Sequence, residues 1–532
     1  MRCLVLLLLL PYYGWAFVGM GARSPRVVVR AATEVDVCVV GSGVSGSSLA
    51  HFLAKDVSVL LAEARSEVGG NVISKEKDGF IWEEGPNSFQ PTPAVMQLAY
   101  EAECASELVL ADKTLPPWVF YDGKLRPLPK NLPGDLLNFD LLSWPGKIRA
   151  GLGAVGLLLD ESPEDKEETI EEFVTRHLGK ECFERIIDPF VSGVYAGDPK
   201  RLSMRSALRK IFRLQTLSPF RGALVPGAFV RFDEIYKEKE ANPPDPKWPT
   251  YEAGELGSFR KGLQTLPLAI KAKIDKLPSS RVETNWTLVK IEKSDKNRWK
   301  VCFENGEVVI AKAVCVTAPA RNVAPVVENL SKKCADALRK VYSPPVCSVT
   351  VAYPKTAFKD PKLPGFGSLN PRSQGIRTLG TIWSSSLFPD RCPPDYNLLL
   401  NYIGGSRDEH IMDLSDQDLL DAIDDGCKKS QILKKDAPPP KLIGLKRWDQ
   451  AIPQYHLKYQ SDVLEPLADF EAEHPGLFLG GNYRTGVAFG DCVQFGLDTS
   501  LILRDYLQQQ ATNAQLPSSS KEEEKKPVVA AR

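Results

Sequence analysis

Residues 35–46 read VDVCVVGSGVSG, and this stretch decides the fold of the chain. Its first six residues, Val35–Val40, form an apolar run with the length of a buried β-strand, and a helical stretch follows at 47–55. A second apolar run, 57–62, leads to Glu63. The order of strand, glycine-rich turn, helix and strand predicts a parallel α/β unit of the kind that binds dinucleotides.

The glycines of that turn, Gly41, Gly43 and Gly46, each meet a separate requirement of a dinucleotide site. Gly41 permits the tight turn, Gly43 lets the backbone approach a pyrophosphate, and Gly46 lets the helix pack on the sheet. The helix N-terminus offers free N–H groups and a partial positive charge to the phosphates. Glu63, 22 residues past Gly41, is suitably placed to accept hydrogen bonds from a ribose diol. We favour this interpretation over a glycine-rich turn in an α/β unit without a ligand.

The composition of the 532-residue chain is that of an ordinary globular protein, with 43% hydrophobic and 25% charged residues. Lys and Arg together number 67, as do Asp and Glu, so a nucleic-acid partner is not expected. The eleven cysteines and five histidines are scattered, and no C-x-x-C pair occurs. This pattern indicates free thiols in a reducing compartment and no metal site.

The N-terminal residues 1–33 have the composition of a targeting sequence. They contain no acidic residue, and the apolar run 3–10 is too short to span a bilayer but suits a signal-peptide core. The following stretch, 17–32, begins with Phe and carries three arginines. A signal peptide followed by such a stretch resembles the two-part presequences of algae with secondary plastids. We therefore predict a plastid location, ahead of ordinary secretion or a mitochondrion.

A second group of motifs decides between FAD and NAD. The stretches 69–71 (GGN) and 82–88 (WEEGPNS) resemble the extension with which glutathione-reductase-type flavoproteins contact the far end of FAD. Near the C-terminus, 477–482 (LFLGGN) and 486–491 (GVAFGD) precede a helix predicted over 492–509, which the last aspartate is expected to cap. In that superfamily this loop meets the isoalloxazine ring. FAD is therefore predicted, and the residues expected to bind it are Gly41, Ser42, Gly43, Val44, Ser45, Gly46, Glu63, Ala64, Arg65, Gly69, Gly70, Asn71, Gly85, Pro86, Asn87, Ser88, Leu288, Asn482, Val487, Ala488 and Phe489.

Six longer stretches carry a more specific resemblance than the glycine motif. They are 82–90 (WEEGPNSFQ), 147–154 (KIRAGLGA), 189–205 (PFVSGVYAGDPKRLSMR), 257–267 (GSFRKGLQTLP), 378–391 (TLGTIWSSSLFPDR) and 402–407 (YIGGSR). In this order they resemble the chloroplast-type protoporphyrinogen oxidases, a family of the flavin amine-oxidase superfamily. The resemblance covers roughly residues 34–508.

The resemblance implies an α/β fold. It consists of a glutathione-reductase-type FAD-binding domain, an inserted α+β substrate domain and a helical, membrane-associated domain. The implied divisions are an FAD-binding domain at 34–95, 255–325 and 445–510, a helical domain at 96–210, and a substrate domain at 211–254 and 326–444. Composition adds the presequence at 1–33 and a disordered tail at 511–532.

The family's chemistry is the oxidation of protoporphyrinogen IX to protoporphyrin IX in heme and chlorophyll synthesis. Six electrons are removed in three steps, and three O₂ become three H₂O₂. The resemblance implies hydride transfer from a methylene bridge to the flavin, so the cofactor carries the chemistry and no catalytic side chain is expected. It also implies association with a plastid membrane surface, often as a homodimer.

Five residues are candidates for contact with the substrate: Asn87, Gly193, Trp383, Leu387 and Phe388. Asn87 is the polar residue expected nearest the flavin, and the aromatic and aliphatic residues are candidates to sandwich the macrocycle. Roles in a turn or in the core explain the same residues.

One position departs from the family pattern. Relatives often place an Arg for a substrate propionate just before the aromatic-Val pair, but here Trp118 follows Pro117. Arg126 or Lys124 could replace that Arg, or could be surface charges.

Four other possibilities stay open at this stage, one of them an inactive or retuned paralogue, which only Pro117 suggests. An amine oxidase is less favoured, because the cysteine that attaches flavin covalently in many of them has no counterpart within 460–481. A carotenoid desaturase shares the chemistry but not the long matches. A non-catalytic relative such as a Rab GDP-dissociation inhibitor would not need the complete FAD motifs.

The leucine-rich segment 136–159 suits either a membrane surface or a buried core helix.

Overall fold

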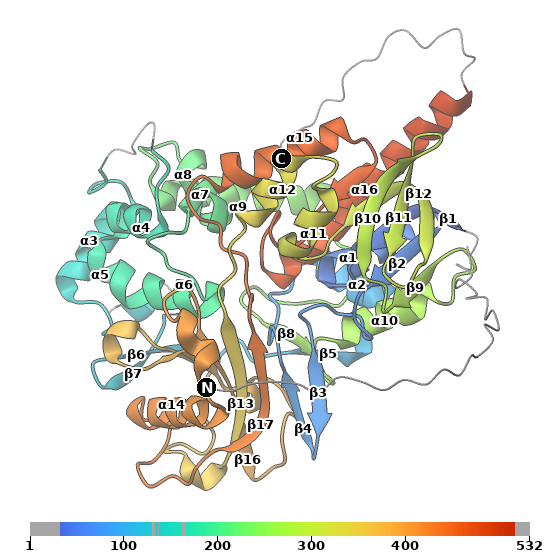
Figure 1. Cartoon of the computed structure of the whole chain (residues 1–532). Coiled ribbons are helices and arrows are strands. Elements are labelled where there is room, and N and C mark those ends of the chain that lie inside the picture. Colours follow the sequence, from blue (N-terminus) through green and yellow to red (C-terminus); the bar gives the residue numbers. More distant parts are fainter. Residues whose placement is uncertain (1–31, 130–133, 137, 161–165, 516–532) are drawn as a thin grey trace, which may run out of the picture.

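The computed structural model describes residues 32–129, 134–136, 138–160 and 166–515. The predicted presequence therefore lies almost entirely outside the described residues, as does the tail beyond residue 515. Within the described part, two large sheets and a cluster of helices form three regions that meet near the middle of the molecule (Figure 1), and two small two-stranded sheets are also present.

The first sheet is built around β1 (Thr33–Val40), as the opening motif predicts. Its neighbours β2 (Val59–Glu63) and β12 (Val308–Val316) both run parallel to it. Side chains of β1 alternate, so that Val37 and Val39 face one core and Cys38 and Val40 face the other. The sheet is completed by β9 (Arg281–Thr284), β10 (Leu288–Ser294), β11 (Arg298–Phe303) and β18 (Leu477–Leu479).

Helices cover both faces of this sheet, as burial of both faces requires. On one face, α1 (Val44–Leu53) packs closely against α16 (Phe489–Gln515). At Gly496 a Cβ would lie 2.7 Å from the Leu49 amide, so only glycine allows this approach. The first face also carries α2 (Pro93–Glu101) and α10 (Thr265–Ile274), and the other carries α11 (Ala320–Val327), α12 (Lys332–Arg339) and α15 (Glu465–Glu473).

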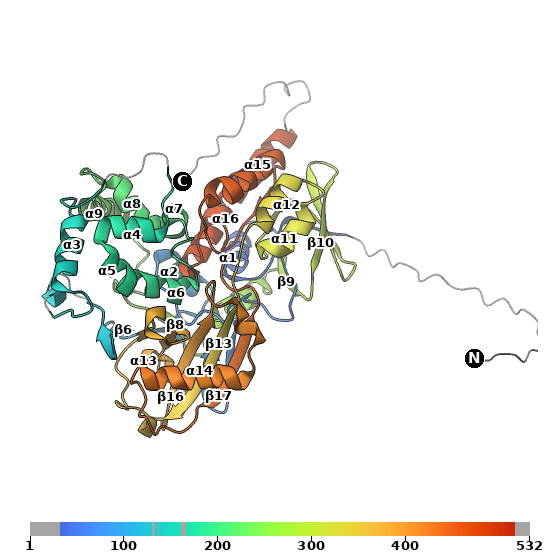
Figure 2. The ribbon, with the colours of Figure 1, turned by 60° about the vertical axis from the view of Figure 1, so that its left-hand side comes forward.

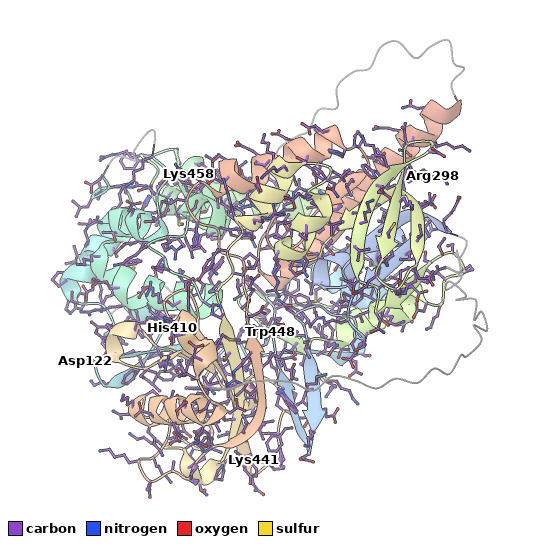
Figure 3. The ribbon with its side chains drawn as sticks, in the orientation of Figure 1. Asp122, Arg298, His410, Lys441, Trp448 and Lys458 are labelled. Atoms are coloured by element: carbon purple, nitrogen blue, oxygen red, sulfur yellow. The ribbon has the colours of Figure 1, made fainter. Side chains whose placement is uncertain are left out.

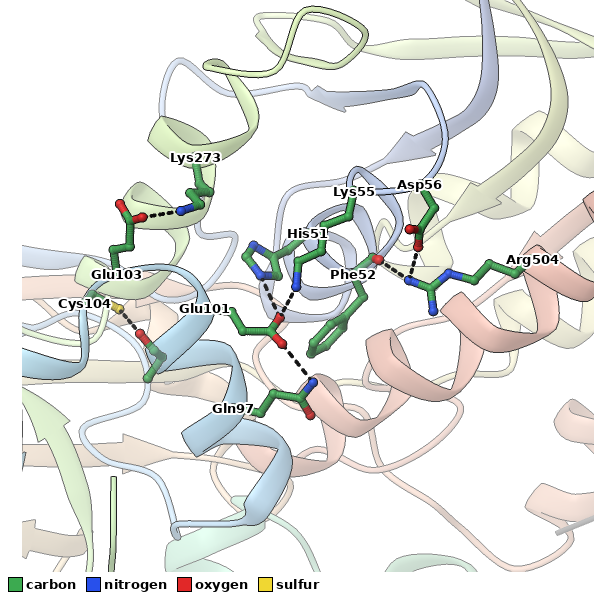
Figure 4. A network of polar contacts seen from close by, with 11 residues as sticks. His51, Phe52, Lys55, Asp56, Gln97, Glu101, Glu103, Cys104, Lys273 and Arg504 are labelled. Carbon is green, nitrogen blue, oxygen red and sulfur yellow. Dashed lines mark hydrogen bonds and ion pairs between the residues drawn. The ribbon is translucent and has the colours of Figure 1, made fainter. Parts of the chain in front are cut away.

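Polar contacts fix α1 between its neighbours (Figure 4). Glu101, at the end of α2, pairs with Lys55 at 2.8 Å and with His51 Nε2 at 3.2 Å. Burial alone would raise the pKa of Glu101, but these bonds and one from Gln97 lower it to about 2. On the other side, Arg504 of α16 pairs with Asp56 at 2.7 Å. The helix that begins at the glycine-rich turn is therefore held rigidly.

The second sheet follows the order β17, β13, β16, β15, β14, β6, β7. One face is covered by α14 (Asp416–Lys429), which lies across the strands in Figure 2. Figure 3 places Lys441 and Trp448 at opposite ends of β17, with Trp448 nearer the first sheet. The strands are β6 (Pro117–Tyr121), β7 (Lys124–Pro127), β13 (Val346–Pro354), β14 (Gly367–Leu369), β15 (Thr378–Ile382), β16 (Tyr396–Gly404) and β17 (Lys441–Trp448).

The third region is helical and contains much of the segment expected there. Its core joins Phe173, Val191 and Met204. Among the described residues, no helix is both long and apolar enough to cross a bilayer. The main helices are α3 (Trp144–Ala154), α4 (Ile170–Leu178), α6 (Asp188–Tyr195), α8 (Arg209–Leu217) and α9 (Leu224–Ala241).

Three segments lie elsewhere than the sequence predicts. The stretch 117–127, expected in the helical domain, forms β6 and β7, because β6 adds to the second sheet in parallel with β14. The stretch 211–241, expected with the substrate domain, packs on the helical core through Phe212 and Leu224. Residues 445–448, expected in the FAD-binding domain, continue β17 of the second sheet.

The last helix is longer than the predicted 492–509, and the expected cap is wrong. Helix α16 begins at Phe489, so Asp491 lies within its first turn and is not the N-cap. Phe489 is buried and stacks on Phe89 with ring centroids 5.2 Å apart, so aromatic packing sets this helix start. At the other end the helix continues to Gln515, beyond the predicted start of the tail at 511.

Candidate FAD and substrate site

The glycine-rich turn forms a backbone cradle at the start of α1. At Gly46 a Cβ would lie 1.9 Å from the Gly41 carbonyl oxygen, and at Gly70 one would lie 2.8 Å from the Gly43 Cα. Gly41 has φ +98°, a conformation that favours glycine. No side chain caps α1 at Gly43, so the amides of its first turn are available to an anion. Substituting these glycines would close the approach that a pyrophosphate needs.

Glu63 lies at the end of β2 beside this cradle and is buried. Its Oε2 accepts hydrogen bonds from the Ser42 amide at 2.8 Å and the Ser42 hydroxyl at 2.7 Å. Its Oε1 accepts from the Arg65 amide at 3.0 Å. The Trp286 amide donates to the Glu63 carbonyl at 2.8 Å, which brings the start of β10, at Leu288, to the same edge. The carboxylate is thus held in one orientation beside the cradle, and its contact with a ribose stays a prediction.

The second glycine pair and the turn after β4 (Phe80–Glu83) join this cradle. Gly69 forms a β-bridge with Gly43. At Gly85 a Cβ would lie 1.8 Å from the Asn71 carbonyl oxygen, so these two predicted segments touch. Motifs separated by up to 44 residues in sequence therefore form one continuous backbone surface.

Asn87 is the buried polar residue of this turn, and only 6% of it is exposed. Its Oδ1 accepts a hydrogen bond from the Ser384 hydroxyl at 3.3 Å. Its Nδ2 has no hydrogen-bond partner in the described part of the chain. A buried donor left unpaired costs about 1–3 kcal/mol, so a bound ligand that accepts from Nδ2 would recover that energy.

The C-terminal loop closes the site from the other side. Tyr455 donates to the carbonyl of Asn482, and Tyr459 donates to the carbonyl of Tyr483 at 2.6 Å. Gly486 has φ +139°, and Val487 and Ala488 lead from it into α16. The loop thus reaches the N-terminus of α16, which packs beside α1. This arrangement fits an extended FAD, with phosphates at one helix start and the ring system near the other.

The predicted substrate residues fall into separate clusters. Trp383 packs on Trp118, with ring centroids 6.4 Å apart, in the core beneath α14. Leu387 and Phe388 pack in another cluster with Val109. Gly193 of α6 lies against β14, where an added Cβ would come within 2.5 Å of the Leu369 side chain. A core role thus describes Trp383 well, while the other positions stay predictions.

The structure also locates the two charges considered for a substrate propionate. Arg126 is buried, donates to the Tyr121 carbonyl and lies 3.3 Å from Asp140, whereas Lys124 is exposed. Pro117 pairs with Gly367 in the sheet. Arg126 is therefore committed to local contacts, and the choice of a propionate partner stays open.

Four residues at this site, two of them buried and two partly buried, were not predicted individually. Tyr402 donates to the Gly85 carbonyl at 2.7 Å, and Trp448 Nε1 donates to the Glu84 carbonyl at 2.8 Å. Glu83 and Arg391 form a buried ion pair behind the turn. Three of these four lie in the stretches that carry the family resemblance, so the resemblance was the signal that could have pointed to them. A sequence match alone does not indicate which side chains contact one another.

A model of the family described as "Flavin containing amine oxidoreductase" matches residues 47–500. This match covers most of the chain and includes Glu63 and the C-terminal loop, and it begins just after the glycine-rich turn. The chain therefore belongs to the flavin-containing amine oxidoreductases.

Full-length relatives narrow the class to protoporphyrinogen oxidases. The chain is 43% identical over 507 residues to the chloroplastic protoporphyrinogen oxidase of Oryza sativa subsp. japonica, covering 92% of each chain. It is 41% identical over 491 residues to the chloroplastic protoporphyrinogen oxidase 1 of Arabidopsis thaliana, covering 90% of this chain and 89% of that one. A solved structure of a putative protoporphyrinogen oxidase from Exiguobacterium sp. 255-15 shares the fold, with a TM-score of 0.70 and 20% identity, and the match covers 90% of this chain and 99% of that one.

Proposed function

We propose that this protein oxidises protoporphyrinogen IX to protoporphyrin IX with bound FAD, and that O₂ is the final electron acceptor. The observation that carries the proposal is the relationship to plant protoporphyrinogen oxidases over nine tenths of the chain. The complete backbone cradle and the fixed Glu63 carboxylate support it independently.

The residues of the site bind, orient and exclude water. FAD, when bound, supplies the two-electron acceptor, which protein side chains do not. The amides at the start of α1 would hold its phosphates, and Glu63 would hold its ribose. Asn87 Nδ2 would donate to the flavin or the substrate. Positioning of the macrocycle is then the main contribution of the chain to the rate.

Anaerobic mixing of the purified protein with protoporphyrinogen IX tests the proposal. We expect the flavin absorbance to bleach, and admission of air to restore it with formation of fluorescent porphyrin and peroxide. A bound flavin that this substrate leaves oxidised would instead favour a desaturase or another member of the superfamily. A protein that purifies without flavin would favour a non-catalytic relative.

We further propose that the helical region rests on a membrane surface. Its apolar side chains Trp144, Ile148, Leu157, Phe229, Phe232 and Tyr236 are each more than half exposed. Gly156 and Phe220 are close neighbours, which joins the segment after α3 to that before α9. Residues 202–232 hold six Lys or Arg and no acidic residue. Exposed aromatic side chains beside an excess of basic ones suit an anionic lipid surface.

Sedimentation with anionic vesicles tests the membrane surface. The double variant F229S/F232S should lose most vesicle binding, whereas the control L268S/V289S, which alters side chains about half exposed on α10 and β10, should keep it. Equal binding by both variants would exclude the surface. We also propose that the protein forms a homodimer. If F229S/F232S loses the dimer, the same exposed face binds a second copy of the chain.

The plastid location remains the proposed destination, supported by the chloroplastic relatives. Residues 1–33 fused to a fluorescent protein should reach the plastid, and removal of 3–10 should abolish import if the presequence has two parts.

A further inference from the structure

Two segments about 300 residues apart are tied together at both of their ends. One is the turn 83–87 after β4, and the other is the segment 383–391 after β15. At one end the Ser384 hydroxyl donates to Asn87 Oδ1 at 3.3 Å. At the other end Arg391 Nη1 lies 3.9 Å from Glu83 Oε1, and the Ile81 amide donates to the Arg391 carbonyl at 2.9 Å. The candidate flavin turn and the candidate substrate segment are thus joined twice.

Arg391 is an unusual residue in this junction because its charge is almost completely buried. Its side chain is 3% exposed, and Nη2 donates to the Ser258 hydroxyl at 2.9 Å and the Phe259 carbonyl at 3.0 Å. Its guanidinium lies over the Phe388 ring, 5.4 Å from the centroid. Nη1 has no hydrogen-bond partner in the described part of the chain, so Glu83 supplies its charge compensation.

The side chain of Glu83 is also buried, with 2% of it exposed. Its Oε2 accepts from the Ser74 hydroxyl at 2.6 Å, and its Oε1 accepts from the Leu263 amide at 2.9 Å. Burial raises the pKa of Glu83 to about 7, against the lowering effects of these bonds and of Arg391. Burial and then the Glu83 charge raise the pKa of Tyr402, whose hydroxyl donates to the Gly85 carbonyl. The pair is therefore close enough to the turn to influence it.

We infer that Glu83 and Arg391 are a positioning pair for the oxidation reaction. The pair fixes the Asn87 turn on one side and Phe388 on the other, so that the substrate meets the cofactor in one geometry. This inference rests on the proposed function. Neither residue touches the reacting atoms, and both act through the segments that they join. Because a misplacement of about 1 Å can cost about 100-fold in rate, such a junction affects turnover more than binding.

The test measures variants of the pair as holoenzymes. Arg391→Met removes a charge that lowers the pKa of Glu83, so Glu83 becomes neutral and the ion pair of the junction is lost. We expect kcat to fall about 10- to 100-fold with a smaller change in KM. FAD content should remain near one per chain, and the visible flavin band should shift because the turn beside it moves. Arg391→Lys should restore part of kcat. The double variant E83Q/R391M should be no slower than R391M, since Glu83 is already neutral once Arg391 is gone.

A second buried ion pair provides the matched control. Arg176 and Glu168 of the helical region lie 2.6 Å apart with side chains 9% and 7% exposed. Arg176→Met should lower thermal stability as much as Arg391→Met but leave the rate per bound flavin within about twofold. If both variants lose only stability, or if the flavin band and kcat of R391M match the wild type, the pair is structural and the inference is wrong.

Two further outcomes are informative. If R391M does not fold, E83Q and R391K answer the same question, because each keeps the volume of the site. If the wild-type holoenzyme is not reduced by protoporphyrinogen IX, the proposed function fails. In that case the flavin band and the FAD dissociation constant still report on the pair: an unshifted band in E83Q and R391K would overturn it, and a shifted band would support it.

Discussion

The candidate cofactor site has two sides that the chain builds in different ways. The first sheet contributes backbone: a short local stretch, Gly41–Gly46, and one carboxylate, Glu63, form the cradle. The second sheet and the segment after β15 contribute side chains from distant parts of the chain, such as Tyr402, Trp448 and Ser384. A backbone cradle depends on the absence of side chains and therefore leaves a clear signal in sequence. A wall of side chains depends on tertiary packing and leaves a weaker one.

The largest expected effect is on the cradle. Gly46→Val would place its Cβ 1.9 Å from the Gly41 carbonyl oxygen, a clash between backbone and side chain that rotation cannot relieve. We expect the variant to purify without measurable FAD and without activity, because overpacking here costs at least about 1–3 kcal/mol and blocks the phosphate approach. The FAD absorbance of the purified protein checks this.

Gly151→Val is the control for that prediction. Gly151 lies in α3 with nothing within 4 Å of an added Cβ. This variant should retain FAD, and its loss would show that the measurement reports general instability and not the cradle.

Phe388 and Trp383 lie in separate clusters on the side-chain side of the site, so substitutions can distinguish a substrate contact from a core residue. Phe388→Ala should raise KM about 10-fold or more if the ring faces the substrate, whereas Trp383→Phe should leave KM within about twofold and cost about 1–2 kcal/mol of stability as a core change. Steady-state kinetics with thermal unfolding of both variants decides this. If only W383F raised KM, Trp383 would be the substrate contact and Phe388 the core residue.

Two carboxylates are expected to respond oppositely to pH. The pKa of Glu83 is raised to about 7, so its stabilising contribution is complete below about pH 4.5 and is lost as pH rises through 7. The pKa of Glu101 is lowered to about 2, so its contribution is present above about pH 4.5 and is lost as pH falls towards 2.

Measuring the free energy of unfolding as a function of pH tests both of these predicted directions. E83Q should flatten the decline in stability between pH 5 and 8, which amounts to at most about 3 kcal/mol. Glu101→Gln should leave that interval unchanged and should be less stable than the wild type at neutral pH. An E83Q curve parallel to the wild type would mean that Glu83 keeps an ordinary pKa.

The same contrast explains what the sequence could predict. The dinucleotide cradle and the parallel α/β unit follow from periodicity and glycine spacing, which are local properties of 35–63, whereas the choice of FAD came from the resemblance of 69–88 and 477–491 to flavoproteins. The membership of β6 and β7 in the second sheet does not, because a strand is assigned to a sheet by a partner, here β14, about 250 residues away. The start of α16 at Phe489 likewise depends on stacking against Phe89. Resemblance to a family supplied the substrate segment, but not which of its side chains face the core.

The smallest expected effect concerns the hydroxyl that connects the two sides. Ser384→Ala removes the 3.3 Å hydrogen bond to Asn87 Oδ1 and leaves the Asn87 amide without a partner at either end. A neutral hydrogen bond contributes about 0.5–1.5 kcal/mol, so kcat should fall only about 2- to 10-fold with FAD content unchanged. Ser384→Thr keeps the hydroxyl and should retain most of the rate.

Combining S384A with R391M sharpens this comparison. If the two ties hold the same segment, the double variant should lose less than the product of the single losses, because the first break already frees the segment. Multiplicative losses would mean that each tie positions its own group independently. The double-mutant cycle in kcat therefore distinguishes one rigid segment held by both contacts from two contacts that act independently. The backbone cradle allows no such distinction, because it is one continuous surface.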